Sequence, residues 1–113
     1  MKKGKTTLAG KEVCIGYSFM TEIGFHNFTG INLSQFNIEN VEHCIYLILS
    51  SVVTYYQGTG ETSPVKDEDL LNDLTPDELK DTMETIMRLR AEFYNVPLGE
   101  TAEEPEEDGG KNR

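Results

Sequence analysis

The sequence predicts a mainly α-helical fold: a small helical domain with a short N-terminal β-hairpin, a buried central helix and an amphipathic C-terminal helix. Residues 38–57 are a long apolar run, and residues 76–95 repeat apolar side chains at helical spacing. The start of the chain is β-prone on both sides of a turn that contains Gly10. Because 113 residues make one domain at most, we expect residues 1–96 to form a single helical domain.

The N-terminal hairpin is predicted from residues 5–8 and 11–15, which are rich in β-branched and other β-prone residues. An isolated hairpin is only marginally stable in water, so it must pack on the helices. Ser18 is the predicted N-cap of the first helix, and Gly30 is its predicted C-terminal residue, since Gly readily adopts a left-handed conformation.

Residues 31–37 are predicted to be a connector that places Leu33 and Phe36 on the core. Asn37 is then the predicted N-cap of the central helix, residues 38–57. Because most of this helix is apolar, we expect it to be buried against several neighbours. It is too short, and too interrupted by polar residues, to span a membrane.

The polar residues of the central helix recur at spacings that place them on one narrow stripe of its surface. We expect this stripe to face solvent or another protein chain. Its members are Glu39, His43, Ser50, Thr54 and Gln57.

A Gly- and Pro-containing loop is predicted for residues 58–66, and one short helical turn for residues 67–74. The C-terminal helix then begins with Thr75 as its N-cap and Glu78 three residues later, the pattern of a capping box. Residues 97–113 contain little to bury and many acids. We therefore expect them to form a disordered acidic tail.

Ten basic and twenty acidic residues give a formal net charge of −10. This balance argues against a nucleic-acid partner, because phosphate contacts need clustered Lys and Arg. Cys14 and Cys44 are expected to be the free thiols of an intracellular protein. The N-terminal lysines precede no apolar signal-peptide region. We therefore expect the protein to stay in the cytoplasm and not to enter a membrane.

No motif for catalysis, cofactor binding or metal binding is present. Residues 67–78 have acids at the first, third and last positions of a calcium loop, but Leu71 and Asn72 replace a required oxygen ligand and a required Gly. His26 and His43 lack the neighbouring ligands of a zinc site, and no phosphate-binding loop occurs. We therefore expect a protein that is not an enzyme and has no cofactor.

What remains is surface for a protein partner. Aromatic side chains near the polar stripe have the amphipathic character that is common at interfaces. The same side chains can equally well cap the core. The candidate partner-binding residues are His43, Tyr46, Tyr55 and Tyr56.

The layout of residues 6–96 resembles the tail assembly chaperones of long-tailed phages and prophages. A β-prone start (TTLAGKEVCIGYS) leads into a helix ending in Thr-Gly (FMTEIGFHNFTGINL), then a buried helix, then an acidic loop before a Thr-Pro-Asp-Glu helix start. The resemblance implies a helical, non-enzymatic protein that holds the long tape measure protein in solution while tail tube subunits assemble. It also implies other tail proteins as partners, many copies per complex and self-association.

The same resemblance implies a longer minor product made by ribosomal frameshifting, and Gly110-Lys111-Asn112 can be encoded by slippery runs. Two other classes of function remain open. One is a small acidic adaptor or regulatory protein that binds one globular partner. The other is an enzyme subunit without its own site, which would require a ligand cleft at His26 or His43.

Overall fold

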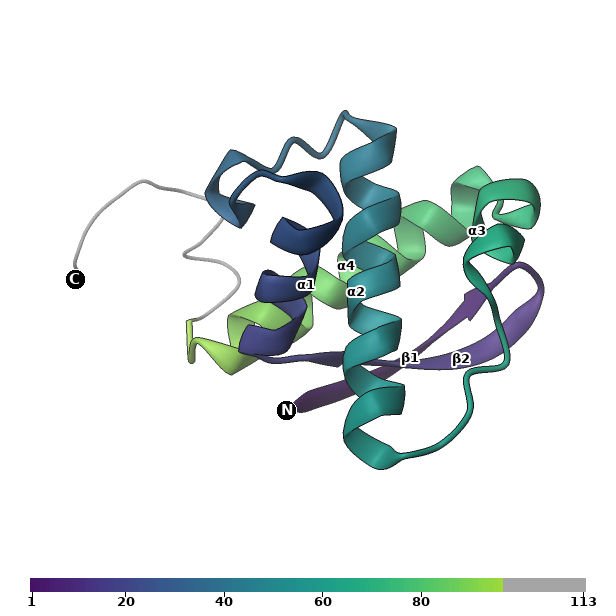
Figure 1. Ribbon diagram of the computed structural model, residues 1–113, viewed down its shortest axis with the longest axis horizontal. Helices are drawn as coiled ribbons and strands as arrows, with labels where there is room; N and C mark the ends of the chain where they lie inside the picture. Colours follow the sequence, from purple (N-terminus) through teal and green to yellow (C-terminus); the bar gives the residue numbers. More distant parts are fainter. Residues whose placement is uncertain (97–113) are drawn as a thin grey trace.

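Within residues 1–96, the computed structural model contains a two-stranded β-hairpin followed by four α-helices, with one short 3-10 helix after the first of them. The predicted fold, mainly helical with an N-terminal hairpin, is confirmed. Figure 1 shows one long helix crossing in front of the hairpin and the other long helix passing behind the first. The predicted acidic tail, residues 97–113, lies outside the described residues.

The hairpin consists of β1 (Lys2–Leu8) and β2 (Lys11–Tyr17), which pair antiparallel along their full length. Both strands are longer than predicted. The two-residue turn has φ of 52° at Ala9 and 78° at Gly10. Left-handed conformation at both turn residues matches the right-handed twist of the strands, so this turn closes a hairpin well.

Helix α1 (Phe19–Thr29) begins and ends where the sequence predicts. The Ser18 side chain accepts a hydrogen bond from the Met20 N–H at 3.1 Å. Gly30 has φ of 79° and its N–H donates to the His26 carbonyl at 2.7 Å. These bonds satisfy backbone groups that a helix end otherwise leaves without partners.

The connector after α1 contains the 3-10 helix η1 (Leu33–Gln35). Leu33 and Phe36 pack against the core, as predicted.

Helix α2 (Val41–Thr59) starts three residues later than predicted. The prediction of Asn37 as its N-cap was wrong: the Asn40 side chain accepts from the His43 N–H at 3.2 Å and is the N-cap. Asn37 instead accepts from the Glu39 N–H at 3.0 Å within a turn. Both Asn residues suit a cap, and only the path of the connector decides between them.

The middle of α2 is buried, as predicted for the central helix. The loop after it is followed by α3 (Asp67–Asp73), which packs on α2. The buried residues of α2 are Cys44, Leu47, Ile48, Leu49, Ser50, Ser51, Val52 and Thr54.

Helix α4 (Pro76–Phe93) starts with the predicted capping box. The Thr75 side chain accepts from the Glu78 N–H at 3.2 Å, and the Glu78 carboxylate accepts from the Thr75 N–H at 3.0 Å. One side of α4 is buried on the hairpin and another is exposed.

The core lies around the hairpin. Helix α2 packs on β2, and α4 packs on β1. One connected cluster contains the buried apolar side chains of the hairpin, the helices and the loop before α3: Leu8, Val13, Ile15, Tyr17, Phe25, Cys44, Leu47, Ile48, Leu49, Val52, Val65, Leu70, Met83, Ile86 and Leu89.

Candidate functional site

The polar stripe predicted on the central helix is not a surface in its middle section. Ser50 and Thr54 are buried against α1. The Ser50 hydroxyl donates to the Thr21 carbonyl at 2.6 Å, and the Thr21 and Thr54 hydroxyls lie 2.9 Å apart. The prediction that this stripe faces solvent or another chain is therefore wrong for its central residues, which hold two helices of the same chain together.

The predicted partner-binding residue His43 is partly buried between aromatic rings. Its ring lies 5.9 Å from that of Phe25 and 6.0 Å from that of Phe36. Its Nδ1 atom accepts a hydrogen bond from the Asn37 N–H at 3.0 Å. These contacts join the connector to α2.

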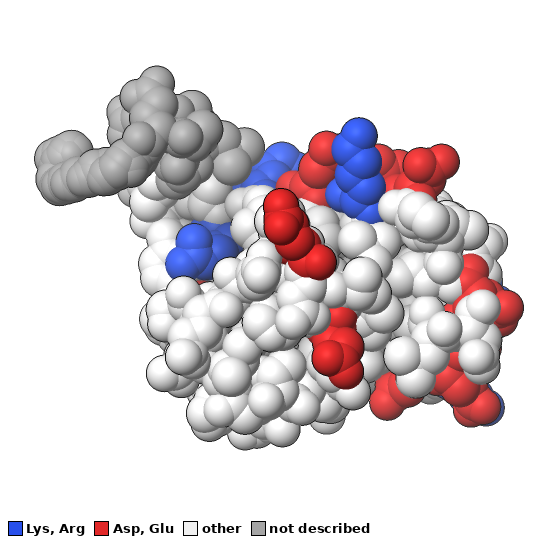
Figure 2. Space-filling view, turned by 90° about the horizontal axis from the view of Figure 1, so that it is seen from above, with Lys and Arg blue, Asp and Glu red and all other residues white. Residues whose placement is uncertain are grey.

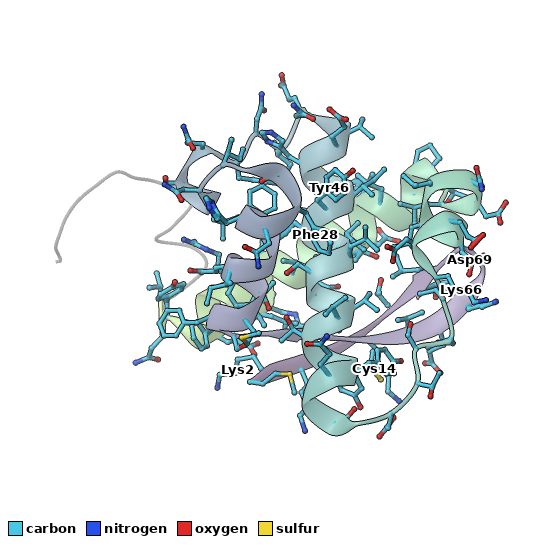
Figure 3. The ribbon with its side chains drawn as sticks, viewed as in Figure 1. Lys2, Cys14, Phe28, Tyr46, Lys66 and Asp69 are labelled. Atoms are coloured by element: carbon cyan, nitrogen blue, oxygen red, sulfur yellow. The ribbon has the colours of Figure 1, made fainter. Side chains whose placement is uncertain are left out.

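Tyr46, the second predicted residue, stacks on Phe28 with ring centroids 5.6 Å apart and an interplanar angle of 22°. Figure 3 shows Phe28 on α1 and Tyr46 on α2 next to each other. Phe28 is an exposed side chain. This aromatic pair therefore closes one end of the surface between α1 and α2.

Tyr55 and Tyr56 lie toward the hairpin, away from Tyr46. Their rings are in edge contact, 4.8 Å apart. The Tyr56 hydroxyl accepts from the Cys14 N–H at 3.1 Å. A hydrogen bond with the Cys14 side chain, together with burial, raises the pKa of Tyr55. The four predicted residues thus fall in two places, and their role in partner binding stays a prediction.

A hollow of about 710 Å³ lies between α1 and α2. Its walls carry exposed apolar side chains, among them Met20 and Ile23, whose exposed fractions are 57% and 51%. We call this feature the α1–α2 groove. It is lined by Met1, Ser18, Met20, Ile23, Gly24, Asn27, Phe28, Ser50, Val53, Thr54, Gln57 and Gly58.

The floor of the groove forms where the two helices approach closely. A Cβ atom added at Gly24 would collide with the Ser50 hydroxyl. Gly at this position therefore lets α1 come near α2, while the longer side chains on both sides stand higher and form the walls. The result is a shallow channel with a small polar floor and walls that carry apolar side chains together with the polar Asn27 and Gln57.

No Lys, Arg, Asp or Glu lines the groove. Figure 2 shows most of the charged side chains gathered along one side of the molecule, and a broad surface beside them that only a few charged side chains interrupt. Exposed apolar side chains that gather without charges between them are typical of a protein-binding surface.

Sequence reasoning missed the groove residues Met20, Ile23, Phe28 and Val53. One signal was available: α1 has five large apolar residues in eleven, more than one buried face needs, and the structure buries only Phe25 of these. The remaining apolar residues stay exposed. An excess of apolar residues in a short helix is thus the sequence feature that points to this surface.

The start of α1 is tied to the end of α4 through one carboxylate. Glu22 accepts hydrogen bonds from the Tyr17 hydroxyl at 2.7 Å and from the Tyr94 hydroxyl at 2.6 Å. Burial, and next the bond to Glu22, raise the pKa of Tyr17. The bond to Glu22 is the main reason that the pKa of Tyr94 is raised. Both tyrosines therefore remain protonated donors that tie α1 to the end of β2 and to the end of α4.

His26 and Cys44, two of the residues considered for chemistry, are near a backbone partner and buried, respectively. His26 borders a second surface hollow with Glu22 and Arg90, and its Nδ1 atom lies 3.2 Å from the Ile31 carbonyl. Cys44 is buried, which raises the pKa of its thiol. In residues 1–96, no three His, Cys, Asp or Glu side chains are placed to hold a metal ion together.

Among the helices of residues 1–96, none is long and apolar enough to cross a membrane. No family model, curated protein or solved structure matched this chain on comparison.

Proposed function

We propose that this protein is a non-enzymatic chaperone that binds the tape measure protein of a phage or prophage and keeps it in solution during tail tube assembly. The observation that carries the proposal is the α1–α2 groove, which is open, carries exposed apolar side chains on its walls and is lined by no Lys, Arg, Asp or Glu. The layout of residues 6–96, which resembles the tail assembly chaperones, supplies the identity of the partner. The site of action would be the cytoplasm of the bacterial host.

The groove suits one apolar stripe of a helix. A helix with apolar side chains at three- and four-residue spacing can lay them into a channel between two helices, which is a common mode of peptide recognition. A long helical protein exposes such stripes until its final partners enclose it. Many copies of a small grooved protein, associating along its length, would cover these stripes.

The remaining surface fits this role. We propose that α4 serves as an amphipathic C-terminal helix: Met83, Ile86 and Leu89 face the core, and its exposed side carries charges such as Lys80 and Glu84. With a formal net charge of −10 for the chain, complexes coated by many copies would repel one another and stay dispersed.

The test is co-expression of the tagged chain with the proteins of its neighbouring genes, followed by affinity capture and mass spectrometry. We expect one very long helical protein with many copies of this chain bound to it. Capture of one compact globular partner at equal ratio would replace this proposal with the small acidic adaptor.

A pair of variants connects the binding to the groove. Ile23→Asp puts a charge on the groove wall and is expected to reduce capture of the long partner by about tenfold or more, because the charge must lose water on binding. Leu71→Asp is the matched control, since Leu71 is 64% exposed on α3 and does not line the groove. Equal capture by the two variants would show that the groove is not the binding site.

A further inference from the structure

Strand β1 has an outer edge that no described residue pairs with. It is hydrogen-bonded to β2 on one side only, in a sheet of two strands. Such an edge presents a row of backbone donors and acceptors to any chain that can pair with it.

The register determines which groups point outward. In a hairpin with a two-residue turn, the residues that flank the turn exchange backbone hydrogen bonds, and every second pair does so after that. Leu8 and Lys11 flank the turn here. The N–H and C=O groups of Lys3, Lys5 and Thr7 must therefore point away from β2, and among residues 1–96 no hydrogen bond to them is found.

Two of the corresponding groups of β2 bond to other parts of the chain. The Cys14 N–H donates to the Tyr56 hydroxyl at 3.1 Å, and the Gly16 carbonyl lies 3.1 Å from the Thr21 hydroxyl. The outward direction of these two groups agrees with the hydrogen-bond pattern of the hairpin, because Cys14 and Gly16 stand opposite Lys5 and Lys3 in the register. The fold thus engages two groups on the outer edge of β2 and, among residues 1–96, none on the outer edge of β1.

The open edge is also the basic part of an acidic protein. The hairpin contains four of the ten Lys and Arg residues and one of the twenty Asp and Glu residues. Lys3 and Lys5 are exposed and, as residues two apart in a strand, lie on the same face. Their charges act locally, because screening limits them to about 10 Å at moderate salt.

This charge distribution disfavours pairing between two copies of the edge. A second β1 would bring its own lysines opposite Lys3 and Lys5, and like charges opposite each other in a sheet are destabilising. Lysines on an edge strand are a common protection against such self-pairing. The same lysines favour a strand with acids at the facing positions.

We propose that the outer edge of β1 accepts an extended segment of another protein as a third strand, and that this segment carries Asp or Glu at alternate positions. Its backbone would bond to the N–H and C=O groups of Lys3, Lys5 and Thr7. Its acids would pair across the strands with the Lys3 and Lys5 ammonium groups. This surface is distinct from the α1–α2 groove and does not depend on the function proposed for it.

The test uses the full chain and a synthetic peptide, acetyl-Thr-Glu-Val-Glu-Val-Glu-Thr-amide, with amide exchange followed by NMR. We expect the N–H groups of Lys3, Lys5 and Thr7 to exchange quickly in the free protein and about tenfold more slowly with peptide bound. The same peptide with Lys in place of Glu should bind about tenfold more weakly or not at all. Equal binding of both peptides would overturn the proposal.

Variants separate backbone pairing from attraction between charges. Thr7→Pro removes one outward N–H and keeps both lysines, and an edge strand tolerates Pro where its N–H faces solvent. Relative to the matched variant Thr7→Val, it should bind the peptide about tenfold more weakly. Lys3→Glu/Lys5→Glu should lose affinity to a similar extent, while Lys3→Arg/Lys5→Arg should keep it.

A further peptide covers the case in which Thr7→Pro fails to fold. N-methylation of every second peptide amide blocks strand pairing on one edge of the peptide and leaves the charges in place. Two such peptides are possible, one for each set of alternate amides, and one of them should fail to bind the unaltered protein. Binding of both methylated peptides would overturn strand addition. Slow exchange of the Lys3, Lys5 and Thr7 amides without peptide would also overturn the proposal. An exchange rate that does not depend on protein concentration would mean that a segment of the same chain pairs with the edge. A rate that depends on concentration would mean that a second copy pairs with it.

Discussion

Gly24 lies at a close contact between α1 and α2, and a Cβ atom there would collide with the Ser50 hydroxyl. That hydroxyl cannot simply turn away, since it donates to the Thr21 carbonyl at 2.6 Å. From the sequence, a Gly inside α1 only weakens the expected helix, by about 1 kcal/mol relative to Ala. In the structure, the missing side chain of Gly24 allows the contact between α1 and α2 that forms the floor of the groove.

Gly24→Ala is therefore expected to destabilise the protein by about 1–3 kcal/mol, since overpacking outweighs the gain in helix propensity. Thermal unfolding should show Tm lower by roughly 5 °C or more. Gly58→Ala is the matched control, because a Cβ there meets only the flexible end of the Met1 side chain, so its Tm should be unchanged or higher. If Gly24→Ala melts at or above the Tm of the unaltered protein, the two helices are not in close contact.

Ser50 and Thr54 show where a residue-level pattern was misleading. Their regular spacing predicts a polar stripe, and polar stripes on helices usually face water. Here the Thr54 hydroxyl donates to the Ser50 carbonyl in its own helix at 2.7 Å, and Thr21 of α1 lies against both residues. Small hydroxyl side chains can satisfy themselves in this way, so they are poor indicators of exposure.

At the scale of elements, the hairpin turn and the start of α4 are joined by Glu78. Its carboxylate accepts from the Ala9 N–H at 3.0 Å and from the Gly10 N–H at 2.9 Å, besides the N-cap N–H of Thr75. The left-handed backbone of the turn presents both of its N–H groups to one carboxylate. The bond to Thr75, and then those to the turn, lower the pKa of Glu78.

This network predicts a pH dependence of stability. Because the pKa of Glu78 is lower in the folded protein than the ordinary Glu value of about 4.3, its stabilisation is fully present above that pH and is lost as the pH falls through the folded pKa. Glu78→Gln should lower the free energy of unfolding at pH 7 by about 1 kcal/mol. The difference from the unaltered protein should shrink below about pH 4.

Urea unfolding of both proteins between pH 7 and pH 3 measures this difference, with Asp81→Asn, an exposed acid on the same helix, as the control. A difference that stays constant across this pH range would show that the Glu78 charge does not hold the turn.

At the scale of the whole molecule, one apolar cluster joins the hairpin to the helices on either side of it. The hairpin would be only marginally stable alone, and α2 and α4 pack both on it and on each other. We expect the described part of the chain to unfold cooperatively, as small domains usually do.

Ile48 is fully buried in this cluster, with 0% of its surface exposed. Ile48→Asp is expected to unfold the protein, because an unpaired buried charge costs several kcal/mol and total stability is typically about 5–15 kcal/mol. Ile38→Asp makes the same chemical change at a residue that is 62% exposed and should leave Tm within about 3 °C. Circular dichroism of both variants decides the matter, and a folded Ile48→Asp protein would contradict the core described above.

The sequence by itself determined the features that depend on neighbouring residues. The hairpin, the caps of α1, the buried middle of α2 and the capping box of α4 all follow from spacing, from Gly at positive φ and from side chains that bond to nearby N–H groups. Where two neighbouring residues suited the same local role, as Asn37 and Asn40 did, the sequence could not choose.

Only the tertiary structure decided what each face of a helix meets. It buried Ser50 and Thr54 behind α1 and left Ile23 and Met20 exposed to form a groove. It also bonded part of the outer edge of β2 but, among residues 1–96, none of the outer edge of β1. The physical reason is that burial depends on how elements far apart in the chain pack together. Periodicity shows that a helix has two faces, but the packing partner determines which of them is exposed.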